Sequence, residues 1–355
     1  MATTVIPVGG PRAYDVHVGR DLYGVLPELA AGAARVAVVF TRSVEHYAKH
    51  VTEALIAAGF VGVPVEVPDA EASKTVATAQ HCWDVLGANG FTRTDVVVGV
   101  GGGAATDLAG FVAACWLRGV PWISVATSVN GMVDAALGGK TGVNIGAGKN
   151  LVGAFHPPAG VLCELSALET LPVGQLRAGL AEVVKGGFIA DPVILELIEA
   201  DAGAAVDPAG PVLRELIERK VRVKAEVVAE DLTEKGRREI LNYGHTLGHA
   251  IERAEAYAWS HGHAVAVGMV YAAIVGRRTG RVDVVERTKA ILRSLDLPVT
   301  YRPDAWDTLV AAMRVDKKAR GASMRFVLLD AVAEPTTVTI DDEGLLRAAY
   351  EELTA

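Results

Sequence analysis

The chain has 355 residues, of which 51% are hydrophobic and 21% charged, and its formal net charge at pH 7 is −8. The length predicts two domains, and the composition excludes a disordered chain, a disulfide-stapled miniprotein and a collagen-like fibre. The negative charge argues against a nucleic-acid partner, because phosphate binding needs a basic face. Cys82, Cys115 and Cys163 are too few and too widely spaced for a disulfide framework or a zinc motif. We therefore predict three buried free thiols in a reducing cytosol.

No targeting or membrane segment is expected. The first twenty residues lack the basic stretch and apolar core of a signal peptide. The most apolar region is interrupted by Asp107, Arg118 and many glycines, so no run reaches membrane-spanning length. These features predict a cytoplasmic protein with no membrane partner.

The first half of the chain alternates between strand and helix patterns. Strands are predicted at Arg35–Phe40, Gly62–Val67, Asp95–Val100 and Pro121–Ala126, with helices over Val44–Ala58 and up to Ala88. Almost continuous apolar runs such as Asp95–Val100 are typical of strands buried on both faces of a parallel sheet. The alternation predicts a Rossmann-like, doubly wound α/β domain.

The second half is predicted to be mostly helical. Helical spacing of apolar residues covers Leu176–Lys185, Pro192–Ala200, Val212–Glu230, Ile240–Glu252, Val265–Arg278 and Val284–Leu295. One late hairpin is predicted from Arg325–Leu329 and Thr336–Ile340, and a surface loop over Asp201–Pro211. We place the boundary at Leu171–Pro172, which gives an α/β domain of residues 1–171 and a helical domain of residues 172–355.

Gly101, Gly102 and Gly103 follow the Asp95–Val100 strand and lead into a helix from about Ala105. Glycines there let the backbone approach a phosphate, and the start of the helix supplies free N–H groups. A tight strand-to-helix turn without a ligand explains three glycines equally well.

A second group of polar residues lies in glycine-rich segments, predicted as loops, at 138–144 and 148–150. Lys140, Lys149, Asn150 and Asp134 stand out among small apolar residues, which favours an anionic ligand over solvated loop lysines. The segment lacks the spaced glycine and the preceding strand of a P-loop, which excludes that type of ATP site.

Four histidines, His245, His249, His261 and His263, fall within nineteen residues. His245 and His249 are one helical turn apart and share a face. Two imidazoles and the carboxylate of Glu182 would form an open three-ligand site typical of catalytic zinc. The spacing alone does not decide which histidines bind, and the absence of a His-Glu-x-x-His motif argues against a metalloprotease.

Further cations occur in the helical half, and we expect some of them to surround a polyanionic substrate. Lys185 lies three residues after Glu182 and so shares its helix face. The other candidates are Lys224, Arg238, Lys317 and Lys318.

Together these motifs resemble the 3-dehydroquinate synthase family within the sugar phosphate cyclases, over nearly the whole chain. The matching stretches are Glu71–Lys74, Gly101–Gly103 with Asp107–Gly110, Leu117–Gly119, Met132–Asp134, Gly139–Gly142, Gly148–Phe155, Gly179–Lys185 and Asn242–Ala250. The resemblance implies an N-terminal NAD-binding domain, a C-terminal domain that binds metal and substrate, an active site between them and a homodimer.

The resemblance also implies the roles of individual residues. The implied ligands of Zn²⁺ (or Co²⁺) are Glu182, His245 and His261. The implied NAD contacts are Asp69, Glu71, Lys74, Gly101, Gly102, Gly103, Asp107, Thr127, Ser128, Lys140, Lys149, Leu168 and Thr170. The implied substrate and catalytic residues are Lys140, Asn150, Lys185, Lys224, Arg238, Asn242, His249, Asp134, one of Lys317 and Lys318, and Arg118 reaching from a neighbouring subunit.

In the family reaction, 3-deoxy-arabino-heptulosonate 7-phosphate gives a hydride to NAD, loses phosphate, regains the hydride, opens its ring and closes a carbocycle by an aldol step. Asn130 and His263 differ from the residues common in the family, which leaves the exact substrate open. The alternatives are an aminodehydroquinate synthase, another sugar phosphate cyclase, a metal-dependent alcohol dehydrogenase and a non-catalytic metal-binding protein.

Overall fold

The computed structural model describes residues 2–315 and 324–355, and these form two compact units. The first unit comprises residues up to Leu171 together with Lys224–Thr233, and the second comprises Pro172–Val223 and Glu234–Ala355. The short segment Lys224–Thr233 is therefore separated in sequence from the rest of its unit. No helix among the described residues has the length and apolar composition needed to cross a membrane.

The first unit is built on a seven-stranded sheet with the order β1-β2-β9-β6-β5-β3-β4. All neighbouring strands are parallel except the edge pair β1–β2. The strands are β1 (Thr4–Val8), β2 (Tyr14–Gly19), β3 (Arg35–Thr41), β4 (Val61–Val67), β5 (Val96–Gly101), β6 (Trp122–Ala126) and β9 (Gly160–Glu164).

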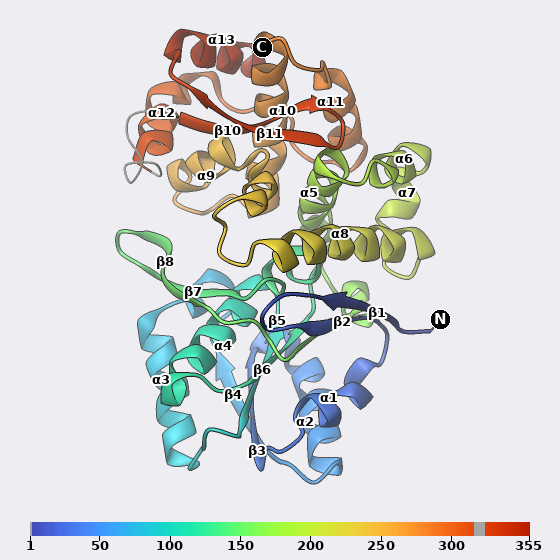
Figure 1. Cartoon of the computed structure of the whole chain (residues 1–355), viewed down its shortest axis with the longest axis vertical. Coiled ribbons are helices and arrows are strands. Elements are labelled where there is room, and N and C mark those ends of the chain that lie inside the picture. Colours follow the sequence, from blue (N-terminus) through green and yellow to red (C-terminus); the bar gives the residue numbers. More distant parts are fainter. Residues whose placement is uncertain (1, 316–323) are drawn as a thin grey trace. The chain divides into compact units, whose positions relative to one another are not determined.

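Helices cover both faces of this sheet (Figure 1). Val36 and Val38 of β3 pack with α1 (Leu26–Leu29) and α2 (Glu45–Ala57) on one face. Ala37 and Val39 pack with α3 (Val76–Ala88) and α4 (Gly103–Cys115) on the other. Because successive side chains of a strand point to opposite faces, this strand is apolar throughout. The prediction of a doubly wound α/β domain is confirmed.

Several elements of the first unit differ from the sequence prediction. The 138–150 region, predicted as loops, forms an antiparallel hairpin of β7 (Lys140–Ile145) and β8 (Gly148–Phe155). Its glycines permit close strand pairing: a Cβ on Gly153 would lie 2.2 Å from the Thr141 carbonyl oxygen. The prediction of three buried thiols is wrong for Cys115, which is exposed at the end of α4, whereas Cys82 and Cys163 are buried.

The second unit is mainly helical and is organised around α10, which is buried along most of its length. Helices α5, α9, α11 and α13 and strand β10 contact α10 (Figure 1). Its elements are α5 (Val173–Ile189), α6 (Val193–Ala200), α7 (Ala202–Ala205), α9 (His245–Ala254), α10 (His261–Arg278), α11 (Val285–Ser294), α12 (Trp306–Val315), α13 (Glu343–Thr354), β10 (Met324–Ala331) and β11 (Glu334–Ile340). Helix α8 (Pro211–Glu230) contributes residues to both units.

Two sequence predictions for this region are corrected. The helix predicted over Ile240–Glu252 is interrupted, because a 3₁₀ helix at Arg237–Asn242 ends before α9 begins. Gly244 separates the two with a backbone φ of +80°, a conformation that glycine adopts without strain. The predicted loop over Asp201–Pro211 contains α7, whose first turn is capped by the Asp201 carboxylate.

Helices α9 and α10 cross with almost no space between their backbones. A Cβ on Gly268 of α10 would lie 1.9 Å from the carbonyl oxygen of Gly244. We therefore predict that Gly268→Ala lowers the free energy of unfolding by about 1–3 kcal/mol, the range typical of overpacking. Denaturation in urea measures this change.

Gly276→Ala is the matched control on the same helix. The nearest atom to a Cβ at Gly276 is 4.0 Å away, and alanine favours a helix interior over glycine by roughly 0.5–1 kcal/mol. This variant should keep or raise stability. An equal loss in both variants would contradict the close crossing as the cause.

Candidate metal centre and nucleotide site

The strand-to-helix turn of the first unit is a cradle of three glycines. Gly101, at the end of β5, has a φ of +153°, and α4 begins at Gly103 with no side-chain cap. A Cβ on Gly103 would lie 2.8 Å from Cβ of Ala135, and one on Gly102 would lie 3.2 Å from Oγ of Ser128. The glycines therefore allow Ala135 and Ser128 to pack closely, and the first N–H groups of this 13-residue helix, which no side chain caps, suit an anion such as a nucleotide pyrophosphate.

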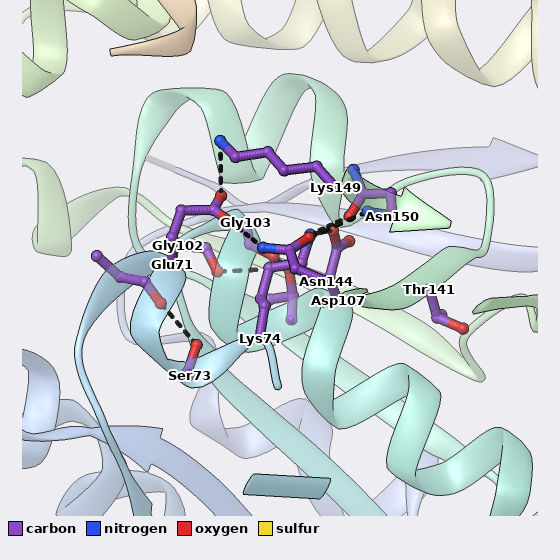
Figure 2. A network of polar contacts seen from close by, with 12 residues as sticks. Glu71, Ser73, Lys74, Gly102, Gly103, Asp107, Thr141, Asn144, Lys149 and Asn150 are labelled. Atoms are coloured by element: carbon purple, nitrogen blue, oxygen red, sulfur yellow. Dashed lines mark hydrogen bonds and ion pairs between the residues drawn. The ribbon is translucent and has the colours of Figure 1, made fainter. Parts of the chain in front are cut away.

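Lys74 lies beside this turn and is almost fully buried, with 3% of its surface exposed. Its Nζ is 2.5 Å from Asp107 Oδ2 of α4 and 2.5 Å from Asn150 Oδ1 of β8 (Figure 2). A buried ammonium group needs such partners, because its desolvation costs several kcal/mol. Lys74 therefore ties β8 to α4.

Asn144 of β7 links the remaining members of this network (Figure 2). Its Nδ2 donates to Glu71 at 2.6 Å, and its Oδ1 accepts from the backbone N–H of Asn150 at 3.0 Å. Lys149 Nζ lies 3.5 Å from Glu71 Oε1. Asn144 was assigned no role from the sequence, and only its place between Lys140 and Asn150 pointed to it.

Lys224 belongs to the first unit, because its contacts are mainly with that unit. It is buried, and its Nζ lies 2.6 Å from Asp134 Oδ1. Hydrogen bonds from Ser43 hold the pKa of the exposed Asp69 below its usual range. The remaining predicted residues of this unit take these positions: Thr127 and Leu168 are buried, Ser128 is half-buried, Lys140, Arg118 and Thr170 are exposed.

Three potential metal ligands converge in the second unit. Glu182 of α5 is fully buried, and its Oε1 lies 3.5 Å from Nε2 of both His245 and His261. The three ligand atoms lie within 4.8 Å of one another. One carboxylate and two imidazoles match the donor set of an open zinc site. Lys185, one turn along α5, lies 2.5 Å from the other Glu182 oxygen.

Both histidines are held at their second ring nitrogen. Nδ1 of His245 lies 3.2 Å from the Tyr243 carbonyl oxygen, and Nδ1 of His261 lies 3.1 Å from Glu252 Oε2. A carbonyl or carboxylate oxygen only accepts, so each Nδ1 donates a proton, and Nε2 is the nitrogen directed to Glu182. This arrangement leaves Nε2 of each ring as the atom for a metal.

The environment sets the charge of the two rings differently. Burial, reinforced by the nearby Lys185 ammonium, keeps the pKa of His245 well below its usual value. Burial also disfavours charge on His261, but hydrogen bonds from its ring to Glu182 and Glu252 outweigh it and raise its pKa to about 10. A cation bound at Nε2 takes the place of the proton that this pKa retains.

The other predicted residues of the second unit do not join these three ligands. His249 is exposed, and with Glu252 and His261 it forms a second group of potential ligands. His263 is half-buried beside the Trp259 ring. Arg238 is buried, and Asn242 donates to Glu234 at 2.7 Å. Lys317 and Lys318 lie outside the described residues.

Similarity to known proteins agrees with this combination of nucleotide cradle and metal ligands. Two solved cyclases cover nearly the whole chain. One is 2-deoxy-scyllo-inosose synthase with carbaglucose-6-phosphate, NAD⁺ and Co²⁺, at 27% identity, a TM-score of 0.86 and coverage of 98% of this chain and 99% of that one. The other is 2-epi-5-epi-valiolone synthase of Streptomyces hygroscopicus with NAD⁺ and Zn²⁺, at 26% identity, a TM-score of 0.87 and 96% coverage of both. A probable glycerol dehydrogenase from Sinorhizobium meliloti shares the fold at 16% identity and a TM-score of 0.68.

Two protein-family models identify the family within the cyclases. The model described as 3-dehydroquinate synthase N-terminal matches residues 64–178, and the model described as 3-dehydroquinate synthase C-terminal matches residues 179–319. Proteins named 3-dehydroquinate synthase from Streptomyces avermitilis and Thermobifida fusca are 57% and 58% identical over 99% of this chain, and the matches cover 99% and 96% of those proteins. The chain belongs to the 3-dehydroquinate synthase family, which confirms the resemblance read from its motifs.

We predict that metal content separates the three ligands from their neighbour His249. His261→Ala should lower bound zinc from about one ion per chain to a small fraction, since a three-ligand site loses one donor. His249→Ala should retain the metal. Elemental analysis after dialysis checks both. Metal loss in His249→Ala with retention in His261→Ala would reverse the assignment.

Proposed function

We propose that this chain is a 3-dehydroquinate synthase. It converts 3-deoxy-arabino-heptulosonate 7-phosphate to 3-dehydroquinate with elimination of phosphate, as a lyase of the shikimate pathway and aromatic amino acid biosynthesis. The observation that carries the proposal is 56–58% identity to proteins of that name over 99% of this chain. The convergence of Glu182, His245 and His261 in the second unit agrees with it.

The first unit has residues that fit NAD. The start of α4, which no side chain caps, would hold its pyrophosphate. Asp69, Glu71 and the Lys74–Asp107 pair would contact the rest of the cofactor. When bound, NAD accepts a hydride from a substrate hydroxyl and later returns it.

The second unit has residues that fit a divalent metal, Zn²⁺ or Co²⁺. Glu182, His245 and His261 would hold it with one carboxylate and two imidazoles, a donor set typical of catalytic zinc sites. When bound, the metal withdraws electron density from the hydroxyl oxygen that is oxidised. Lys185 keeps an ammonium group beside Glu182 and limits the net negative charge there.

We propose that buried cations recognise the two anionic groups of the substrate. Arg238 and Lys224 are buried, although the chain as a whole carries a net charge of −8. Charge-assisted hydrogen bonds to carboxylate and phosphate oxygens are the contacts for which buried cations are suited. Lys140, Asn150, Asn242, His249, Asp134 and one of Lys317 and Lys318 complete the proposed substrate contacts.

Arg118 has a separate proposed role across the interface of a homodimer. It is exposed, and it lies with Leu117 in a turn where both have left-handed backbone angles, at φ of +69° and +45°. Such a conformation is uncommon outside glycine and tends to persist at functional sites. We propose that the turn presents Arg118 to the phosphate bound by a second copy of the chain, and that the homodimer acts in the cytoplasm.

NAD should be needed only in catalytic amounts. The hydride is returned in each turnover, so phosphate release should continue for many turnovers per NAD without accumulation of NADH. Parallel assays of released phosphate and of NADH absorbance check this. One NADH per phosphate released would instead indicate a net alcohol dehydrogenase.

Arg238→Ala tests the substrate class. Loss of one charge-assisted hydrogen bond costs about 1.5–3 kcal/mol, so kcat/KM for the heptulosonate phosphate should fall roughly ten- to a hundredfold or more. The unaltered enzyme should turn over sedoheptulose 7-phosphate, which lacks the carboxylate, poorly. Efficient cyclisation of sedoheptulose 7-phosphate would indicate a valiolone-forming cyclase. Preference for the amino analogue of the heptulosonate phosphate would indicate an aminodehydroquinate synthase.

A further inference from the structure

Glu252 is a buried carboxylate that no sequence motif singled out. It lies near the end of α9, with 5% of its surface exposed, seven residues after His245. Its Oε2 is 3.1 Å from Nδ1 of His261, the first residue of α10. Helix α9 therefore supplies one candidate metal ligand directly and contacts a second ligand through Glu252.

The geometry at His261 shows that Glu252 contacts a candidate metal ligand and is not itself one of the three ligands. The two nitrogens of an imidazole ring point in different directions, and Nε2 of His261 is directed to Glu182, 3.5 Å away. Because the Glu252 carboxylate only accepts, Nδ1 of His261 holds a proton and is not available to a metal. His249, Glu252 and His261 form a second group of potential ligands, but His249 is exposed.

His245 provides an internal comparison. Its Nδ1 donates to the neutral Tyr243 carbonyl, whereas Nδ1 of His261 donates to a carboxylate. A charged acceptor makes the stronger hydrogen bond and makes the opposite ring nitrogen the better electron donor. The two imidazoles are therefore oriented in the same way but are unequal as donors.

We propose that Glu252 is a positioning residue that holds His261 as the Nδ1–H tautomer, with Nε2 turned to Glu182, and thereby controls how tightly the metal is retained. The inference rests on the proposed metal centre. Partners of this kind typically change metal affinity by about 10–100-fold.

The experiment compares Glu252→Gln and Glu252→Ala in the full chain. Glutamine keeps an acceptor oxygen but loses the charge, and alanine loses both. Zinc affinity is measured by competition with a chelator, and the site geometry by the visible absorption spectrum of the Co²⁺-loaded protein. We expect the dissociation constant to rise by about 10–100-fold in Glu252→Ala and by less in Glu252→Gln, with altered Co²⁺ bands and an unchanged metal stoichiometry.

Glu255→Gln is the matched control, since it makes the same change three residues along the chain, where the carboxylate contacts Tyr301 and Arg302. It should leave affinity and spectrum unchanged. Circular dichroism confirms that each variant is folded, and the near-isosteric Glu252→Gln decides the outcome should alanine unfold the chain.

Each alternative result has a distinct meaning. Unchanged zinc affinity and Co²⁺ spectrum in folded Glu252→Gln and Glu252→Ala would overturn the proposal. A drop from two metal ions per chain to one would also overturn it, because Glu252 would then be a ligand of a second metal. Failure of the unaltered chain to bind metal, or retention of metal in His261→Ala, would instead refute the proposed metal centre itself.

Discussion

Burial of the Glu182 carboxylate is the constraint on which the second unit depends. An ionised carboxylate removed from water costs several kcal/mol unless positive or hydrogen-bonding groups surround it. Helices α5, α9 and α10 bring Lys185 and two imidazole rings to it, and they can do so only where their backbones come close. A Cβ on Gly262 would lie 1.8 Å from the Ala178 carbonyl oxygen, directly beside His261. The glycines of these helices and the polar centre are therefore parts of one arrangement.

The same fold supports different chemistries, so function has to be argued from individual side chains. A probable glycerol dehydrogenase and a sulfoacetaldehyde reductase share the architecture at 16% and 14% identity. In this chain the buried cations and the pairing of Lys74 with both Asp107 and Asn150 set the electrostatics of the first unit.

The sequence was most informative for strands whose two faces are both buried, because burial determines the apolar pattern of their residues. The runs at Arg35–Phe40 and Asp95–Val100 predicted β3 and β5, because a strand covered by helices on both faces must be apolar throughout. Strands β1 and β2, the antiparallel pair at one end of the sheet, were not predicted, because exposed or half-buried residues interrupt their apolar pattern. The break at Gly244 was missed, because the apolar spacing continues across it while the backbone does not.

For the site, family motifs supplied the residues that spacing could not choose among. Spacing placed His245 and His249 on one face but could not show that only His245 has its Nε2 at Glu182, which depends on the crossing of α9 and α10. Glu252 and Asn144 were overlooked because their importance comes from the hydrogen bonds they make to other residues. Nothing in their local sequence distinguishes them from ordinary surface residues.

The segment Lys224–Thr233 has a consequence for how this chain can be made and divided. Asp134 pairs with Lys224, and Gly10 lies against Ala229, so the α/β unit includes residues separated from it by more than fifty positions of sequence. Contacts between distant parts of a chain form late, after the intervening residues are available. During synthesis the first unit therefore cannot be completed when residue 171 leaves the ribosome and must wait for part of the helical unit. A fragment that ends at residue 171 would leave Asp134 without this partner, so the first unit is complete only in a chain that extends to Thr233.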